Sequence, residues 1–431
     1  MDIFAERRER VLESIDGAAI VQAAPIAIRN NDVEQPWRQD SDLYYLTGCD
    51  EPESVLVVTK SHGQHRSVLF LRPRDPEREV WDGERVGVEA APARFGVDAA
   101  FPIAELKRRL PEYLSGASEL VYERGKSGEL DAIVELAITS ARARGRATKP
   151  WPRTVRHPDA VWHEHRLRKD DSERELMRRA AAITTDAHLN AMRATRPGMH
   201  EYEIHALLFE AFHRGGCERP AYAPIVGSGP NATVLHYRGN RRQMHDGELL
   251  LIDAGCEHAY YACDVTRTFP VNGRFTPPQR AVYEAVLAAQ EAAIGATKPG
   301  ATIEELHAVT VRALTEGMIG AGLLSGSVEE AIETETYRRY YMHRTSHWLG
   351  MDVHDVGSYF VDGRPRPLAS GMVLTIEPGI YVAQDDERVA PELRGIGVRI
   401  EDDILVTESG YENLTQAIPK TVDEVERACR G

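Results

Sequence analysis

The sequence has no excess of positive charge and no long apolar run, which argues against two large classes of protein. Its 431 residues contain 52 Lys and Arg against 67 Asp and Glu, for a formal net charge of -15. A nucleic-acid-binding protein needs a basic face, so we do not expect a nucleic-acid partner. The most apolar stretch, residues 17–28, is interrupted by Gln22 and Pro25, and it predicts a buried strand and not a membrane span of about 18 residues.

Cysteine is scarce, and several common catalytic motifs are absent. The five cysteines are scattered without a CxxC pair, which argues against a disulfide framework and a thiolate metal site. The opening residues, MDIFAERR, lack the apolar segment of a secretory signal, so we expect a cytoplasmic protein. There is no HExxH, GxSxG or Walker loop, and Gly395 and Gly397 lack the third glycine of a dinucleotide fingerprint. Ser346, between His343 and His347, has no base that singles it out as a nucleophile.

The chain is long enough for more than one domain, since single cores rarely grow beyond about 250–300 residues. Residues 1–147 mix apolar strands with helical patterns, which is typical of an α/β domain. A proline-rich segment at residues 148–153 breaks both helix and strand and predicts a linker. We therefore expect an N-terminal α/β domain at residues 1–165 and a C-terminal domain at residues 166–431. The expected N-terminal elements are strands at 18–28, 54–59 and 67–71 and helices at 103–114 and 129–144.

The C-terminal part contains an internal repeat. ATRPG at residues 194–198 recurs as ATKPG at 296–300, and EIHA at 203–206 recurs as ELHA at 305–308. Both pairs are separated by 102 residues, so we predict two halves, each with a helix, a Pro-Gly turn and a second helix. Capping boxes, in which two side chains satisfy the first amides of a helix, are predicted at Ser172–Glu175 and Thr302–Glu305. We expect the helices to cover a shared sheet, with a site between the halves.

Carboxylates recur on the apolar strands of this part. Residues 248–253 and 260–268 predict a hairpin around a turn at 255–258, and residues 372–381 and 397–406 predict further strands. An ionised carboxylate in an apolar strand is costly unless it is paired or bound to metal, and several together repel one another. Two divalent cations would balance four carboxylates, with one imidazole as a neutral ligand. The strands carry Asp253, Asp264, Glu377 and Glu401, and a segment between them carries His343, His347 and His354.

Each of these features has a plainer interpretation. An aspartate at a strand end is usually a turn former, and a histidine beside apolar residues is more often a hydrogen-bonded core residue than a ligand. Residues 401–403 could form an exposed acidic run. It is the combination, four carboxylates on four apolar strands with a histidine-rich segment between them, that favours a metal centre.

At these residues the sequence resembles the pita-bread metallopeptidases, and within them the aminopeptidase P family. The resemblance reaches the N-terminal part through residues 31–32 and QDSDLYYLTG at 39–48, so it covers nearly the whole chain. It implies an α/β N-terminal domain followed by an α+β pita-bread catalytic domain with an internal pseudo-twofold repeat. The strings that carry it are IVGSGPNATVLHY at 225–237, LIDAG at 251–255, DVTRTFP at 264–270, SHWLGMDVHDVG at 346–357, TIEPGIY at 375–381 and GVRIEDD at 397–403.

The resemblance also implies two divalent metal ions, most commonly Mn²⁺, held by five ligands. Asp253 would bind one ion, and His347 and Glu377 would bind the other. Asp264 and Glu401 would bridge the two. Oxygen-rich ligation with one imidazole is compatible with manganese, and cobalt or zinc can occupy such sites as well.

The implied activity is release of the N-terminal residue from peptides that have proline at the second position. A hydroxide that bridges the two metal ions would attack the first peptide bond, and Glu377 would carry the proton. Arg399 would hydrogen-bond a ligand carboxylate, with Tyr381 in a supporting role. The candidates to stabilise the oxyanion are His236, His354 and His343. The expected substrate contacts are Tyr222, Tyr381, Trp81, Asp32 and Arg146, of which the last three match N-terminal positions that reach the site in the family, partly across subunits.

Three alternative functions are compatible with parts of this pattern. An Xaa-Pro dipeptidase shares the ligand set but cleaves only dipeptides, and SHWLG at residues 346–350 favours the aminopeptidase. A methionine aminopeptidase lacks this N-terminal domain. A non-catalytic pita-bread module that binds a protein partner would be expected to have lost metal ligands. The family implies a homodimer or homotetramer that acts on peptides with an Xaa-Pro N-terminus, without nucleic-acid or membrane partners.

Overall fold

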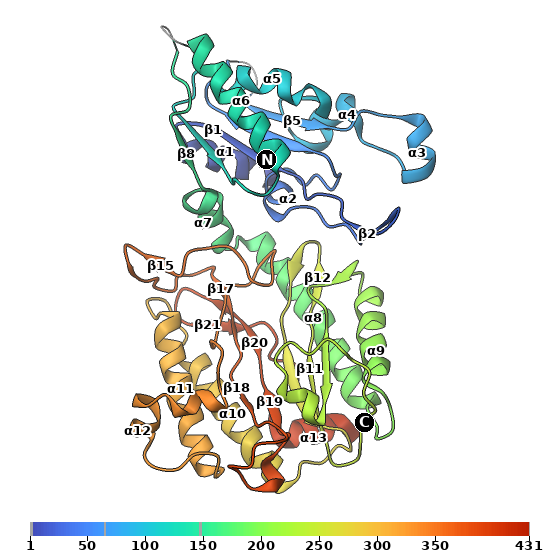
Figure 1. Ribbon diagram of the computed structural model, residues 1–431, viewed down its shortest axis with the longest axis vertical. Coiled ribbons are helices and arrows are strands. Elements are labelled where there is room, and N and C mark those ends of the chain that lie inside the picture. Colours follow the sequence, from blue (N-terminus) through green and yellow to red (C-terminus); the bar gives the residue numbers. More distant parts are fainter. Residues whose placement is uncertain (1–2, 64–65, 146–148, 431) are drawn as a thin grey trace. The chain divides into compact units, whose positions relative to one another are not determined.

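The structure is a computed structural model that describes residues 3–63, 66–145 and 149–430. The chain divides into two compact units, Met1–Glu164 and His165–Gly431, which are coloured blue to green and green to red in Figure 1. Within the described residues, no helix has both the length and the apolar character that crossing a membrane requires.

The N-terminal unit is built on a six-stranded mixed sheet in the order β6-β5-β4-β1-β7-β8. Helices α5 and α6 pack on one face of the central strands, and α1 and α2 pack against the other. Since both faces are covered, the central strands β4 and β5 are continuous apolar runs. The strands are β1 (Gly17–Gln22), β4 (Val55–Thr59), β5 (Ser67–Leu71), β6 (Ala99–Pro102), β7 (Glu119–Tyr122) and β8 (Thr154–Arg156), and the helices are α1 (Ile3–Ser14), α2 (Ser41–Thr47), α3 (Pro76–Asp82), α4 (Gly87–Phe95), α5 (Leu106–Leu114) and α6 (Gly128–Gly145).

Two predictions for this unit were wrong in detail. The strand predicted at 18–28 ends at Gln22, before Pro25, and the chain then forms a separate hairpin of β2 (Ile28–Asn30) and β3 (Val33–Glu34). The proline-rich segment does not separate the two units, because β8, which follows it, pairs with β7 inside the N-terminal sheet. Proline stops local hydrogen bonding, but it does not by itself mark a domain boundary.

The C-terminal unit confirms the predicted repeat. Each half begins with two helices joined by a Pro-Gly turn, and the glycines Gly198 and Gly300 have nearly equal φ angles of 92° and 89°. Those left-handed conformations suit glycine and explain why the turn sequence recurs. The first pair of helices flanks one side of the central strands and the second pair flanks the other (Figure 1). The helices are α8 (Asp171–Ala194), α9 (Glu201–Arg214), α10 (Pro277–Ala296) and α11 (Ile303–Gly320).

The two predicted capping boxes had different outcomes. The box at Thr302 and Glu305 is confirmed at the start of α11. The box at the start of α8 uses Asp170 and Glu173, two residues before the predicted serine. Aspartate is as good an N-cap as serine, and the spacing to Glu173 satisfies the same rule.

The strands predicted around the carboxylates are shorter and more interrupted than expected. β11 (Leu249–Asp253) pairs directly with β14 (Thr266–Pro270), and the predicted turn at 255–258 instead contains β12 (Cys256–His258), which pairs with β13 (Tyr261–Ala262). The two later strands each divide in two, so β17 and β18 replace one, and β19 and β20 replace the other. Their bounds are β17 (Val373–Ile376), β18 (Gly379–Tyr381), β19 (Gly397–Arg399) and β20 (Asp402–Val406).

The remaining elements complete the unit. β10 (Ile225–Ser228) extends the β11–β14 sheet, and β21 (Tyr411–Asn413) extends the β17–β20 sheet. A buried apolar cluster joins α8, α9 and α10 to the strands of both halves. The smaller elements are α12 (Val328–Glu333), α13 (Val422–Arg430), β9 (Arg219–Pro220), β15 (Phe360–Val361) and β16 (Arg364–Pro365). Helix α7 (Trp162–Leu167) contains the boundary between the two units.

Candidate metal centre

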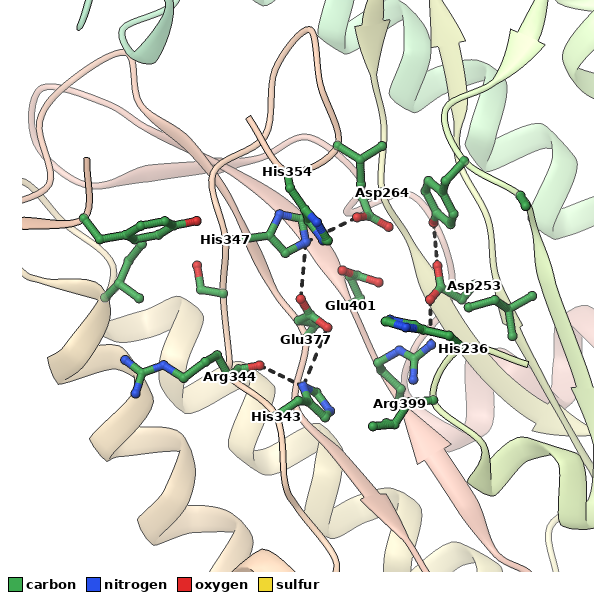
Figure 2. A pocket seen from close by; sticks show the side chains of 18 of the residues that line it. His236, Asp253, Asp264, His343, Arg344, His347, His354, Glu377, Arg399 and Glu401 are labelled. Carbon is green, nitrogen blue, oxygen red and sulfur yellow. Dashed lines mark hydrogen bonds and ion pairs between the residues drawn. The ribbon is translucent and has the colours of Figure 1, made fainter. Parts of the chain in front are cut away.

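Four carboxylates lie where strands of the C-terminal unit end or break. Asp253 is the last residue of β11, and Asp264 lies two residues before β14. Glu377 lies between β17 and β18, where Pro378 cannot donate a ladder hydrogen bond, and Glu401 lies between β19 and β20. At such positions the backbone leaves the sheet, so the side chains can turn towards a common point (Figure 2).

These side chains line a cavity of about 840 Å³. Segments far apart in the chain form its wall, from Tyr222 in the loop before β10 to Glu401 after β19. Most of the residues predicted for the site are on this wall (Figure 2). They are Tyr222, His236, Asp253, Asp264, His343, His347, His354, Glu377, Arg399 and Glu401.

His347 lies between two of the carboxylates. Its Nε2 is 3.4 Å from Asp264 Oδ2 and 3.3 Å from Glu377 Oε1. Its Nδ1 lies 3.0 Å from the carbonyl oxygen of Trp348, which directs Nε2 towards the carboxylates. Ligand atoms of Asp264, His347 and Glu401 all lie within 4.8 Å of one another, a spacing that one ion can span.

The cluster is electrostatically unfavourable without a cation. Burial raises the pKa of Glu377 to about 7, with help from the charges of Asp264 and Asp253. Burial and the neighbouring carboxylates also raise the pKa of Glu401 well above its usual value, and burial raises that of Asp253 against the opposing effect of Arg399. Because their negative charges repel one another, these carboxyl groups do not all ionise together, and bound divalent cations would balance those charges.

The protonation of His347 reflects the same surplus of negative charge. Burial lowers its pKa, but the hydrogen bond that His347 donates to Asp264 and the charges of Glu377 and Asp264 outweigh burial and raise it to about 9. In effect a proton takes the place that a metal would occupy. Four carboxylates with one imidazole therefore fit divalent cations that accept oxygen and nitrogen ligands.

Arg399 organises the ligand carboxylates from behind. Its guanidinium donates to Asp253 Oδ2 at 2.6 Å and to the hydroxyl of Thr266 at 3.0 Å. The Thr266 hydroxyl donates in turn to Glu401 Oε2 at 2.7 Å. Tyr222 also donates to Asp253, at 2.5 Å. One buried cation thus orients carboxylates of two different strands.

A chain of hydrogen bonds leads from Arg399 to His343. Arg399 donates to the Tyr381 hydroxyl, which lies 2.9 Å from His343 Nε2, while His343 Nδ1 lies 2.8 Å from the carbonyl oxygen of Arg344. Burial lowers the pKa of His343 to about 4, so the ring is neutral at physiological pH. Tyr381 lies behind the cavity wall and acts through its two neighbours.

His236 and His354 occupy more open positions on the wall. The His354 ring packs edge-on against the His347 ring, with centroids 4.4 Å apart. Burial lowers the pKa of His354, so its ring is also neutral near pH 7. Both rings are exposed, and a bound substrate could reach them.

The substrate contacts predicted from the N-terminal part of the chain belong to the other unit and not to the C-terminal unit that contains the carboxylates. Asp32 and Trp81 belong to the N-terminal unit and are exposed, Trp81 by 84%. Arg146 lies outside the described residues. Their contact with substrate stays a prediction.

The acidic run at residues 401–403 is buried, which rules out its plainer interpretation as a solvated surface. Asp402 pairs with Arg267, itself fully buried, and with Lys420, and these cations hold the pKa of Asp402 below its usual range against the effect of burial. Arg267 also donates to the backbone oxygen of Glu401 at 2.6 Å.

Asp403 was missed by the sequence reasoning. Its Oδ2 accepts the backbone N–H of Asp264 at 3.1 Å, and burial raises its pKa well above the usual value. The available signal was its place on β20, directly before the apolar residues 404–406. A carboxyl group there holds the backbone of a predicted ligand.

The loop that carries His347 and His354 is also fixed by charge. Asp355 is buried and lies 2.9 Å from Lys169 Nζ and 2.6 Å from Arg166 Nη2. These two cations hold its pKa below the usual value against the effect of burial. Neither cation was singled out from the sequence, because both precede α8 and lie far from the loop in the chain.

Comparison with known proteins agrees with this geometry. The model of metallopeptidase family M24 matches residues 175–408, and the model of the aminopeptidase P N-terminal domain matches residues 4–122. Together the two matches include five of the six strands of the N-terminal sheet and all five predicted metal ligands.

Individual relatives are similar over almost the full chain. The Xaa-Pro aminopeptidase of Escherichia coli is 45% identical over 426 residues, which cover 98% of this chain and 96% of that protein. The structure of Pseudomonas aeruginosa aminopeptidase PepP has a TM-score of 0.96 and 47% identity, covering 99% of this chain and 97% of that one. The structure of zinc-substituted E. coli aminopeptidase P in complex with product has a TM-score of 0.95 and 45% identity, with coverage of 99% and 97%. The predicted fold, an α/β domain followed by a pita-bread domain, is thereby confirmed.

Proposed function

The chain belongs to metallopeptidase family M24, and on that basis we propose that it is an Xaa-Pro aminopeptidase. It releases the first residue of peptides whose second residue is proline. The observation that carries this conclusion is the convergence of four buried carboxylates and His347 on one cavity, within a chain that is similar to Xaa-Pro aminopeptidases along nearly its whole length.

Two divalent metal ions, most commonly Mn²⁺, would be held by five residues. Asp253 would serve one ion, His347 and Glu377 would serve the other, and Asp264 and Glu401 would be shared. The closeness of His347 Nε2 to both Asp264 and Glu377 supports this division. Manganese suits the oxygen-rich ligand set, and zinc and cobalt are the alternatives. When bound, such a pair of cations lowers the pKa of a water molecule between them and polarises the carbonyl of the first peptide bond.

The residues around the centre then have separate tasks. The carboxylate of Glu377 takes a proton from the attacking water and passes it to the leaving nitrogen of proline. His354 and His236, which are exposed on the cavity wall, donate hydrogen bonds to the oxygen that becomes negative. Arg399 is a positioning residue, since it holds Asp253 directly and Glu401 through Thr266.

Selectivity for proline must depend on shape. The nitrogen of an Xaa-Pro bond carries no hydrogen, so the site cannot select it by an N–H contact. Tyr222 and His343 offer rings on the cavity wall against which the pyrrolidine ring can pack. The free amine of the substrate would be anchored by Asp253. Asp32, Trp81 and Arg146 remain proposed substrate contacts.

The closest rival is an Xaa-Pro dipeptidase, and peptide length separates the two. The full-length protein, reconstituted with Mn²⁺, should release the first residue from Xaa-Pro-Xaa tripeptides and longer Xaa-Pro peptides. A matched peptide with alanine in place of proline is the control and should react at least 10-fold more slowly. Cleavage of Xaa-Pro dipeptides with intact tripeptides would establish the dipeptidase instead.

Assembly and location are part of the same proposal. We expect a homodimer or homotetramer in the cytoplasm, as the family resemblance implies. Light scattering on the purified protein measures the first, and fractionation of cells that express it measures the second. A strictly monomeric, fully active enzyme would contradict the expected assembly without affecting the assignment of activity.

A further inference from the structure

We propose that His157, Asp159 and His163 form a second binding site for a divalent cation, of the type that zinc occupies. These residues belong to the N-terminal unit and have no part in the cavity described above. They follow β8 in the motif HPDAVWH, with Asp159 in a short 3-10 turn, Pro158–Ala160, and His163 in α7. The proposal does not depend on the peptidase activity.

The two histidine side chains converge on one carboxylate oxygen of Asp159. Asp159 Oδ1 is 2.9 Å from His157 Nδ1 and 2.9 Å from His163 Nδ1. One ligand atom from each residue lies within 4.8 Å of the other two. Ligand atoms about 2.0–2.1 Å from a tetrahedral zinc ion are separated by roughly 3.3 Å, so small shifts of these side chains would accommodate the ion.

A buried carboxylate orients one of the histidines. Asp42, in α2, lies 2.9 Å from His163 Nε2, and the two side chains are only 5% and 6% exposed. When Nε2 carries the proton that this contact requires, Nδ1 presents its lone pair to Asp159. An imidazole that donates one N–H to a carboxylate and offers its other nitrogen to a cation is the usual arrangement of a zinc-binding histidine.

The second histidine presents a lone pair to the same place. His157 Nδ1 lies 3.4 Å from the backbone nitrogen of Asp159 and accepts its N–H in the tautomer that carries the ring proton on Nε2. In these two tautomers the Nδ1 lone pairs of both imidazoles face Asp159 Oδ1, each at 2.9 Å. Such a group of acceptors repels itself unless a positive charge lies among them. Protonated imidazoles at His163 and His157 are the alternative source of that charge, and metal analysis separates them from a bound ion.

Two imidazoles and one carboxylate favour zinc over calcium or magnesium, which prefer oxygen ligands alone. The side chains of His157 and Asp159 are 50% and 66% exposed, so the fourth position is open to water. Glu123, whose Oε1 lies 3.9 Å from His157 Nε2, adds negative charge nearby. A bound ion would tie the segment after β8 to α2 through Asp42, which is a structural role.

Zinc bound at the first centre must be separated from zinc bound here. We would therefore use the full-length chain with Asp264→Asn and Glu401→Gln, which disables that centre. Equilibrium dialysis against micromolar ZnCl₂, followed by metal analysis, should show that adding His157→Asn removes one zinc equivalent per chain. Asp159→Asn should have the same effect. The matched control is His245→Asn, which removes an exposed histidine elsewhere and should leave the zinc content unchanged.

Equal zinc content in all these variants would overturn the proposal and leave the protonated His163 as the explanation of the cluster. A crystal grown with zinc gives an independent reading, since anomalous scattering should place an ion between His157 and His163. In the otherwise unaltered chain, His157→Asn should keep full peptidase activity with Mn²⁺. Failure of the proposed function and failure of this site are therefore distinguishable.

Discussion

The Arg399 guanidinium lies 2.6 Å from the Asp253 carboxylate, and both groups are buried at the edge of the cavity. Asp253 thus has a permanent cationic partner on one side, while its other oxygen accepts from Tyr222. Its two oxygens are oriented before any metal binds. The other ligand carboxylates have no cation so close among the described residues, which makes this pair the most directly testable support of the centre.

Replacing Arg399 with Gln should lower the affinity for Mn²⁺ by about 10–100-fold, the range found when partners of metal ligands are removed. The reason is that Asp253 and, through Thr266, Glu401 lose their orientation. Metal content after dialysis and activity at saturating Mn²⁺ measure the two effects separately. Arg399→Lys keeps the charge without the planar geometry and should give an intermediate result. Unchanged metal content and activity in Arg399→Gln would contradict the positioning role.

Replacing Asp264 with Ala should abolish peptidase activity, by at least about 1,000-fold, while the protein remains folded at low temperature. The contact that holds this part of the backbone, from the Asp264 N–H to Asp403, does not involve the lost side chain. Removing one of several mutually repelling carboxylates should leave the metal-free protein at least as stable as the parent. Circular dichroism and thermal melting measure the fold, and a peptide assay measures the activity. Normal turnover with bound metal would refute the shared-ligand role.

Metal-free protein should lose stability as the pH rises. The pKa of Glu377 is raised from 4.5 to about 7, and that of His347 from 6.5 to about 9. A group whose pKa is higher in the folded state stabilises the fold fully below the unfolded pKa and loses that contribution as the pH rises through the folded value. Glu377 therefore loses its contribution to stability between about pH 4.5 and 7, and His347 loses its contribution between about pH 6.5 and 9.

Melting temperatures in EDTA at pH 5, 7 and 9 check this prediction. The stabilisation by added Mn²⁺ should grow with pH, because the cation replaces the protons that the cluster otherwise binds. Glu377→Gln is the matched control, since it removes the lower pH range and narrows that of His347, whose pKa the Glu377 charge helps to raise. A melting temperature of the metal-free parent that rises from pH 5 to pH 9 would count against the assignment.

Chelation should abolish peptidase activity, and Mn²⁺ should restore it.

Replacing Gly255 with Ala should disrupt the segment between Asp253 and Asp264. A Cβ atom at this position would lie 1.7 Å from the carbonyl oxygen of Cys263, so the backbone must move. We expect a loss of at least about 3 kcal/mol in the free energy of unfolding and a loss of bound metal. Gly295→Ala is the control: its Cβ meets nothing within 4 Å, it lies in α10, and it should stabilise by about 0.5–1 kcal/mol. Equal melting temperatures for the two variants would show that the close approach is unimportant.

The paired helices of the C-terminal unit and three strands of the N-terminal sheet, β1, β4 and β5, could be predicted from local patterns, although β1 ends earlier than predicted. The equal spacing of the Pro-Gly turns indicated the two halves, because Gly198 and Gly300 need the same left-handed backbone. Strand ends were harder to predict. The breaks at Glu377 and Glu401 and the short β12 depend on where backbone pairing stops, and that is decided by partners from distant segments.

By itself the sequence determined which residues could form the centre, because carboxylates on apolar strands are costly without a cation and therefore stand out wherever they occur. Only the tertiary structure decided how those residues are held. The hydrogen bonds from Arg399 to Asp253, from the Asp264 backbone to Asp403 and from Lys169 to Asp355 each join positions more than 100 residues apart. No local pattern encodes such distances, since they arise when two halves of a chain pack around a common core.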